Sequence, residues 1–246
     1  MMRFLLPFAA AAGLAGAAHA DTFHVTFEAP GVTQSTAVFS LKGVETFDTV
    51  SQGGGLSFTT DFGSGGIVTG SYSNVDVAAA DPYGGAGGAG NFASTFSGYS
   101  LSLSTTDPAG INYFGFWLSA LDSGNTVTFS RAGTALFTFS ASDLLVLVGG
   151  NSAYFGNPSP AYAGQNGAQP YVFLNFFDTN GVFDTVTFSE TLANAGYESD
   201  NHTVGFYTEE SGTAVPEPAT WALMILGLGA VGGALRRRPL ALTIAR

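Results

Sequence analysis

Short runs in which polar and apolar residues alternate are the strongest constraint on what this chain can fold into. In residues 22–28 every second side chain is Phe or Val, and in residues 99–104 Tyr99, Leu101 and Leu103 alternate with serines. A period of two turns one face of a β-strand toward a core and the other toward water. Further strands are predicted at residues 44–47, 56–60, 67–72, 111–118, 126–130, 135–140, 144–148, 171–177, 183–189 and 202–207.

Glycine-rich breaks separate these runs, and the chain contains 34 glycines. Residues 131–133 and 178–181 are predicted as hairpin connections, the second because Asn180-Gly181 suits the positive φ angles of a tight turn. Many short strands with short connections favour antiparallel pairing. We therefore expect an all-β protein, an antiparallel two-sheet β-sandwich of jelly-roll type, formed by one domain over residues 21–214.

The N-terminal residues 1–20 have the pattern of a secretory signal peptide. Arg3 precedes an apolar run, and the small-x-small ending Ala18-His19-Ala20 follows it. Cleavage before Asp21 is expected, which places the body outside the cytoplasm.

A second uncharged stretch, residues 219–235, is long enough for a helix of about 26 Å, which just crosses a bilayer core. Arg236, Arg237 and Arg238 follow it, and such residues hold a chain end in the cytoplasm. We expect one short transmembrane helix at 219–235 and a cytoplasmic tail at 239–246, with the body anchored at the inner membrane.

The segment 215–221 (Val-Pro-Glu-Pro-Ala-Thr-Trp), followed by Gly227-Leu228-Gly229 and the three arginines, resembles a PEP-CTERM sorting signal. Proteins with this signal are, as the resemblance implies, substrates of an exosortase, a membrane cysteine protease and transpeptidase of Gram-negative bacteria that also make exopolysaccharide. It implies processing at Pro216-Glu217-Pro218 and a final place at the cell surface or in the extracellular matrix. The tail 239–246 departs from the pattern, because such signals usually stop soon after the arginines.

The tripeptide also has a physical rationale. Pro216 and Pro218 fix φ and lack N–H donors, so the segment stays extended, which is the form that proteases bind. Glu217 would then be read by a cationic pocket of the enzyme. The alternative is a proline-rich linker in front of a membrane anchor.

The charge of the body excludes one class of partner. Lys42 and Arg131 are its only basic residues, and with 17 acidic residues they give a formal charge of −15 between Asp21 and Ala214. Such a body repels a phosphate backbone, so nucleic acid is not expected as a partner. The absence of cysteine excludes disulfides, thiolate metal sites and cysteine nucleophiles.

Two long segments stand out between the strands, residues 78–92 and 149–170. The second carries Tyr154, Phe155 and Tyr162. Exposed rings there could stack on the apolar faces of sugars, which predicts a polysaccharide contact. The alternative is that these rings fold back over the edge of the sheet.

Oxygen ligands cluster before the last predicted strand, at Glu198, Asp200 and Asn201. Together with Glu28 or Glu45 they could hold a structural Ca²⁺ ion, although no complete calcium loop is present. No other cofactor is expected.

Catalytic motifs are scarce. Only His24 and His202 remain after signal cleavage, and no Gly-x-Ser-x-Gly elbow, zinc helix or phosphate loop occurs. We expect no enzyme.

The body also resembles, loosely and at residues 112–117, 154–158 and 198–202, the extracellular domains that accompany this sorting signal, a family with no established activity. A non-enzymatic surface or matrix protein associated with exopolysaccharide or biofilm is expected, and a carbohydrate-binding module is the alternative.

Overall fold

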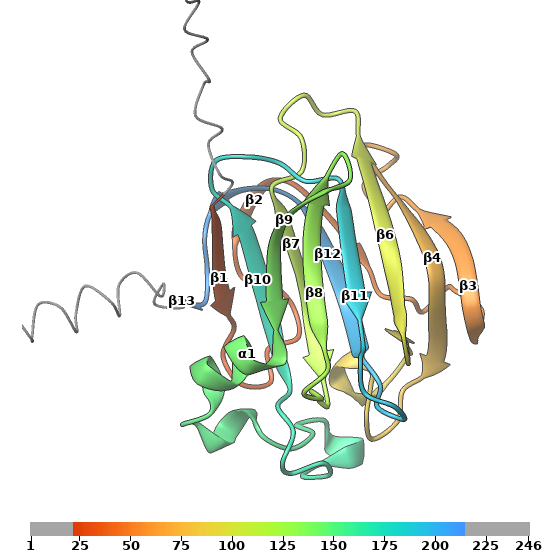
Figure 1. Cartoon of the computed structure of the whole chain (residues 1–246), viewed down its shortest axis with the longest axis vertical. Coiled ribbons are helices and arrows are strands. Elements are labelled where there is room, and N and C mark those ends of the chain that lie inside the picture. Colours follow the sequence, from red (N-terminus) through yellow and green to blue (C-terminus); the bar gives the residue numbers. More distant parts are fainter. Residues whose placement is uncertain (1–21, 215–246) are drawn as a thin grey trace, which may run out of the picture.

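A computed structural model describes residues 22–214 and forms one large antiparallel sheet from them (Figure 1). The strands are β1 (Phe23–Phe27), β2 (Val38–Glu45), β3 (Gly53–Thr60), β4 (Val68–Ala79), β5 (Asn91–Ser94), β6 (Gly98–Thr105), β7 (Tyr113–Ser119), β8 (Thr126–Arg131), β9 (Thr134–Ser140), β10 (Val172–Asp178), β11 (Thr185–Ser189), β12 (Glu198–Glu209) and β13 (Thr213–Ala214). The helices are α1 (Ala141–Val148) and the short 3₁₀ turns η1 (Ala86–Gly88), η2 (Ser152–Tyr154) and η3 (Pro160–Tyr162). The predicted all-β antiparallel class is confirmed.

Several predictions fall on residues that the structure does not describe. These are the signal peptide, the Pro216-Glu217-Pro218 tripeptide, the transmembrane helix at 219–235, the arginines 236–238 and the tail.

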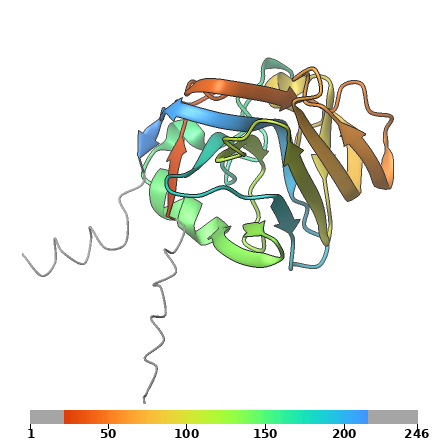
Figure 2. The same ribbon diagram turned by 90° about the horizontal axis from the view of Figure 1, so that it is seen from above.

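The strand order is β13-β1-β10-β7-β12-β5-β4-β6-β11-β8-β9, with β2 added beside β12 and β3 beside β4. One residue pair, Ser199 with Ala93, joins β12 to β5 and so links the two halves of the sheet. Seen from above, the sheet folds over so that its halves face each other (Figure 2). Two separate jelly-roll sheets are therefore not confirmed.

Aromatic side chains fill the space between the halves. Phe116 of β7 lies 5.0 Å from Phe188 of β11, and Phe129 of β8 lies 5.0 Å from Phe176 of β10. Such ring pairs add about 0.5–1.5 kcal/mol each to the free energy of burial. The ring of Phe23 on β1 stacks on that of Phe137 on β9 at 4.9 Å. Since β1 and β9 lie near opposite ends of the strand order, side chains close the sheet into a nearly barrel-like form.

A β-bulge in β12 decides which of its side chains enter the core. Pairing with β7 skips from Asp200 to Thr203, and Asn201 adopts a φ of 51°. An extra residue reverses the alternation of a strand. Ser199 and His202 consequently both face inward, although they are three positions apart in the sequence.

The predicted strand at 144–148 is wrong, because these residues form the second half of α1. The N-cap Ser140 accepts a hydrogen bond from the Asp143 N–H, and the Asp143 carboxylate accepts one from the Ser140 N–H. This capping box satisfies free donors at the helix start. The capping box therefore favours a helix in an apolar segment whose composition is also compatible with a strand.

Two predicted connections have different outcomes. The turn after Arg131 joins β8 to β9 with positive φ at Ala132 (49°) and Gly133 (78°), which confirms that hairpin. Residues 178–181 do not form a hairpin, because β10 pairs with β1 and β7 whereas β11 pairs with β6 and β8. This connection instead crosses from one half of the sheet to the other. The predicted loop at 78–92 overlaps the end of β4 and the start of β5.

Candidate functional site

The last described strand, β13, lies at an outer edge of the sheet and leads directly into the segment with the Pro-Glu-Pro tripeptide. It pairs antiparallel with β1, with Thr213 opposite Phe27 and Ala214 opposite Thr26. On its other side β1 pairs along its whole length with β10. The first and last strands of the body are thus neighbours at one edge (Figure 1).

A buried carboxylate, that of Glu28, stands at the end of β1 and is only 3% exposed. Its Oε1 accepts hydrogen bonds from the Thr36 N–H (3.0 Å), the Asn175 amide (3.0 Å) and the Ser211 hydroxyl (2.7 Å). Its Oε2 accepts one from the Thr36 hydroxyl at 2.8 Å. Four donors replace the water that a buried carboxylate loses.

Three further contacts hold the segment before β13 against β1. The Thr26 hydroxyl donates to the Ser211 carbonyl at 2.5 Å, and the His24 ring hydrogen-bonds to the Glu210 carboxylate. At Gly212 φ is 80°, and a side chain there would come within 2.6 Å of the Phe27 carbonyl oxygen. Only glycine allows this turn to lie so close to β1. We name the contacts of residues 210–214 with β1 and Glu28 the terminal clamp.

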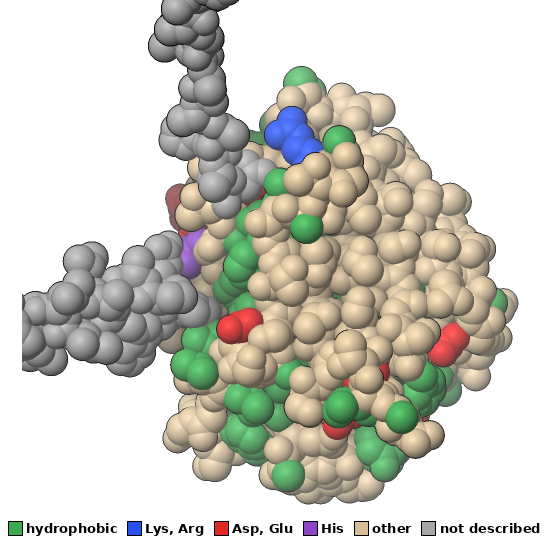
Figure 3. All heavy atoms as spheres, in the orientation of Figure 1, with side chains coloured by type: hydrophobic (Ala, Val, Ile, Leu, Met, Phe, Trp, Pro, Cys, Tyr) green, Lys and Arg blue, Asp and Glu red, His purple; other side chains and the backbone are tan. Residues whose placement is uncertain are grey.

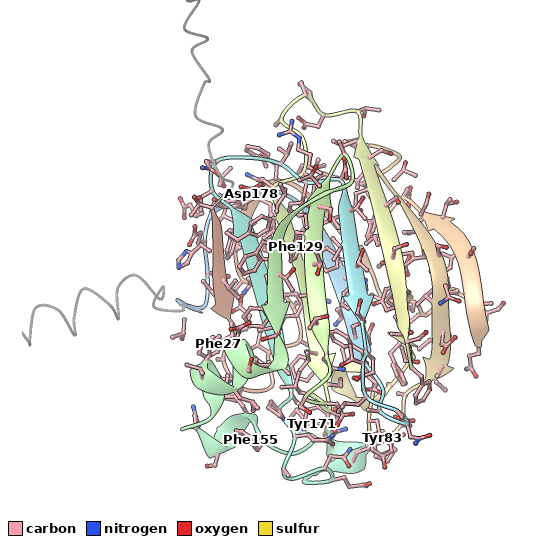
Figure 4. All side chains as sticks on the ribbon, viewed as in Figure 1. Phe27, Tyr83, Phe129, Phe155, Tyr171 and Asp178 are labelled. Carbon is pink, nitrogen blue, oxygen red and sulfur yellow. The ribbon has the colours of Figure 1, made fainter. Side chains whose placement is uncertain are left out.

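The long segments 78–92 and 149–170 meet at one end of the sheet, where Figure 4 shows Tyr83, Tyr171 and Phe155. Tyr154 is 5% exposed, packs edge-on against Phe27 and donates its hydroxyl to the Glu28 carbonyl at 2.9 Å. Phe155 is partly buried against the core, and the hydroxyl of the partly buried Tyr162 donates to the Ala80 carbonyl at 3.0 Å. The three predicted contact rings therefore pack inward to different degrees.

The carbonyl of Pro82 joins these two segments. It accepts hydrogen bonds from the amides of Asn157 (3.0 Å) and Asn166 (2.8 Å) and from the Tyr171 hydroxyl (2.8 Å). Pro82 thereby fixes the neighbouring Tyr83, which is 53% exposed. The sequence pattern did not single out Tyr83, because only exposure distinguishes it from the packed rings.

Most of the visible surface in Figure 3 is uncharged, and hydrophobic side chains gather on the lower part of that face. Leu145 and Val146 of α1 are 42% and 76% exposed. A hollow of about 400 Å³ opens elsewhere, lined among others by Asn112, Arg131 and Phe206.

The predicted calcium ligands do not come together as one set. Glu28 hydrogen-bonds through its N–H to Phe173, which pairs with Trp117, which pairs with Asp200. Three strand spacings, roughly 14 Å, thus separate the backbones of Glu28 and Asp200. Within residues 22–214 no group of three or more His, Cys, Asp or Glu side chains is placed to hold a metal ion.

Three other predicted calcium ligands, Asp200, Asn201 and Glu45, form hydrogen bonds within the protein. Asp200 accepts from the N–H groups of Ala86 (2.7 Å) and Asn201 (2.6 Å), and the Asn201 amide donates to the Thr33 carbonyl at 2.9 Å. The alternative ligand Glu45 accepts from the Phe47 N–H at 2.7 Å. Calcium binding by Glu198, Asp200 and Asn201 with Glu45 in place of Glu28 stays a prediction.

Burial changes the acidity of two of these groups. It raises the pKa of Glu198 to about 8, and Asp122, Asp81 and Glu190 add to the effect by repulsion. It also raises the pKa of Asp200 to about 7, although hydrogen bonds from backbone N–H groups lower that pKa in part. Both carboxyl groups therefore hold a proton over part of the neutral range.

His202 lies at the centre of a buried polar network that sequence reasoning missed. Its Nδ1 lies 2.8 Å from the Tyr72 hydroxyl and its Nε2 lies 3.0 Å from the Ser199 Oγ, which in turn lies 2.7 Å from the Tyr99 hydroxyl. All four side chains are at most 3% exposed, and burial lowers the pKa of His202 to about 3. A serine and a histidine at this distance resemble a nucleophile and its base, but these two are enclosed by aromatic rings and closed to substrate.

None of the helices within residues 22–214 has the length and apolar character needed to cross a bilayer.

Comparison with known proteins adds one family match. The model of the PEP-CTERM protein-sorting motif matches residues 214–238. No curated protein matches the chain. Among solved structures, the K2 cleaved adhesin domain of Lys-gingipain is similar at 15% identity and a TM-score of 0.36, over 68% of this chain and 99% of that domain. A likeness of this strength carries no argument about function.

Proposed function

We propose that this chain, which carries a PEP-CTERM protein-sorting motif at its C-terminal end, is a non-enzymatic exported protein that an exosortase processes at the inner membrane. Its resting place is then the cell surface or the extracellular matrix, in association with exopolysaccharide or biofilm.

One observation carries the proposal. The motif match begins at residue 214, the residue with which β13 ends. The described sheet and its core are built from residues up to this position, so the sorting segment follows a folded body.

Processing of the tripeptide tests the proposal. In a host that encodes an exosortase, Glu217→Ala should leave a larger, membrane-held form on a gel after a pulse-chase. Glu209→Ala changes an exposed acid eight residues earlier and should be processed like the unaltered chain. Equal processing of both variants would contradict the proposal.

The absence of catalysis is supported by the enclosure of Ser199 and His202. The remaining histidine, His24, is engaged by Glu210. Incubation of the body with exopolysaccharide should release no reducing ends above background. Release that His202→Gln abolishes would overturn this part of the proposal.

Polysaccharide binding is a second candidate, and the exposure of Tyr83 beside the segment of Tyr162 supports it. An exposed ring on a fixed loop can stack on a sugar face without reordering. Tyr83→Ala should lower retention of the body on immobilised exopolysaccharide. Phe96→Ala is the matched control, because Phe96 is 64% exposed on a different turn. Equal losses in both variants would indicate only non-specific adhesion.

A further inference from the structure

The terminal clamp leaves almost no free chain between the folded body and the tripeptide. Ala214 is still paired with Thr26, and Pro216 is only two residues further on. Proteases and other peptide-binding proteins take a substrate as an extended strand and use its backbone N–H and C=O groups. The backbone groups of β13, which an enzyme would otherwise pair with, are already paired with β1.

With the predicted membrane helix beginning at residue 219, the clamp would also hold the body near the membrane. From Ala214 to residue 219, where the apolar stretch begins, five residues span at most about 17 Å. If the clamp opens back to Glu209, ten residues span about 35 Å. Opening therefore doubles the space between body and bilayer in which an enzyme can act.

The contacts of the clamp suit a reversible latch. β13 has two residues, and a pairing this short is weak alone. The Ser211 hydroxyl adds a hydrogen bond to the Glu28 carboxylate. His24 and Glu210, 27% and 30% exposed, add a second hydrogen bond that water can reach. The clamp is thus closed in the folded body but can open without disrupting the aromatic core.

We infer that the terminal clamp is an autoinhibitory contact: β13 must leave β1 before the exosortase can bind the strand around Pro216-Glu217-Pro218. This inference rests on the proposed processing at the sorting motif. The clamp sets the rate of processing, whereas the motif sets whether processing occurs.

A disulfide across the clamp tests this inference. Thr26 and Ala214 are direct partners in an antiparallel pair, a spacing that a disulfide can bridge, and the chain has no other cysteine. In the oxidising compartment outside the inner membrane, Thr26→Cys with Ala214→Cys should slow processing at least about tenfold. Ala214→Cys alone should be processed at the rate of the unaltered chain. Thr26→Cys alone should be processed somewhat faster, because it loses the hydrogen bond to the Ser211 carbonyl, and the reduced double variant should match it.

A linker provides the second arm. Eight Gly and Ser residues inserted between Ala214 and Val215 of the locked chain should restore the rate, because the enzyme then has a free strand. Ser211→Ala, which loses one hydrogen bond of the clamp, should speed processing about fivefold.

The outcomes separate the two proposals. A locked chain processed as fast as its single cysteine controls overturns the clamp inference. A locked chain that stays slow with the linker also overturns it, because the lock then acts other than by holding the strand. Unchanged processing of Glu217→Ala overturns the proposed function instead.

Discussion

Ser199 Oγ and His202 Nε2 lie 3.0 Å apart in the core, although the two residues are three positions apart on one strand. On a regular strand their side chains would point to opposite faces, so the bulge at Asn201 makes this contact. The same network includes the hydroxyls of Tyr72 and Tyr99.

We expect His202→Phe to lower the free energy of unfolding by about 2–4 kcal/mol, because it leaves the Tyr72 and Ser199 hydroxyls without their buried partner. Urea unfolding followed by fluorescence measures the change. His24→Gln, at a partly exposed position, should cost less than about 1 kcal/mol. A similar loss in both variants would show that the network adds no stability.

Stability should fall as the pH rises from about 6.5 to 8.5. Glu198 and Asp200 have raised pKa values, about 8 and 7, so the folded chain binds more protons than the unfolded chain in this window. The unfolding free energy then decreases with pH, here by on the order of 2 kcal/mol.

Thermal melts across this pH range, on the parent and on Glu198→Gln with Asp200→Asn, measure the effect. The double variant should have a flatter profile. His202 acts in the opposite direction at lower pH, because its lowered pKa makes stability fall as the pH drops from about 6.5 toward 3. A parent whose melting temperature rises between pH 6.5 and 8.5 would contradict the expected sign.

Gly115→Ala should destabilise the body by about 1–3 kcal/mol or more. A methyl group there would overlap the Tyr113 hydroxyl and lie 2.9 Å from the Leu174 carbonyl oxygen. Gly150→Ala is the control, since a methyl group at Gly150 meets no atom within 4 Å. Equal denaturation midpoints for the two variants would disprove the steric argument.

Ala132→Asn should stabilise the β8–β9 hairpin by about 0.5–1 kcal/mol. Ala132 adopts a φ of 49°, a conformation that Asn tolerates better than Ala. The change is measured as a shift in denaturation midpoint against Ala135→Asn, at an exposed position of β9. A loss of stability in Ala132→Asn would contradict the expectation.

Strands such as β1 and β6 were predictable because apolar and polar residues alternate along them. This alternation shows directly which face of the strand is buried. The helix α1 was not, since an apolar run of Leu and Val suits both structures. Its signal was the Ser140-x-x-Asp143 spacing of a capping box.

The contacts around the bulge at Asn201 and the clamp at Ser211 involve partners 100 or more residues away, such as Tyr99 and Glu28. A pattern in neighbouring residues of the sequence cannot reveal contacts of this kind. The sorting motif, by contrast, is contiguous, and the sequence alone identified it.

The placement of β1 beside β13 has a practical consequence for engineering. Because Ala214 pairs with Thr26, the two ends of the described body lie within about 15 Å of each other. Domains with adjacent ends tolerate circular permutation and insertion into a host loop. A short linker between residues 214 and 22, with new chain ends at the Ala132-Gly133 turn, would give a circular permutant that keeps its core. This permutant would lack both the predicted signal peptide and the sorting motif.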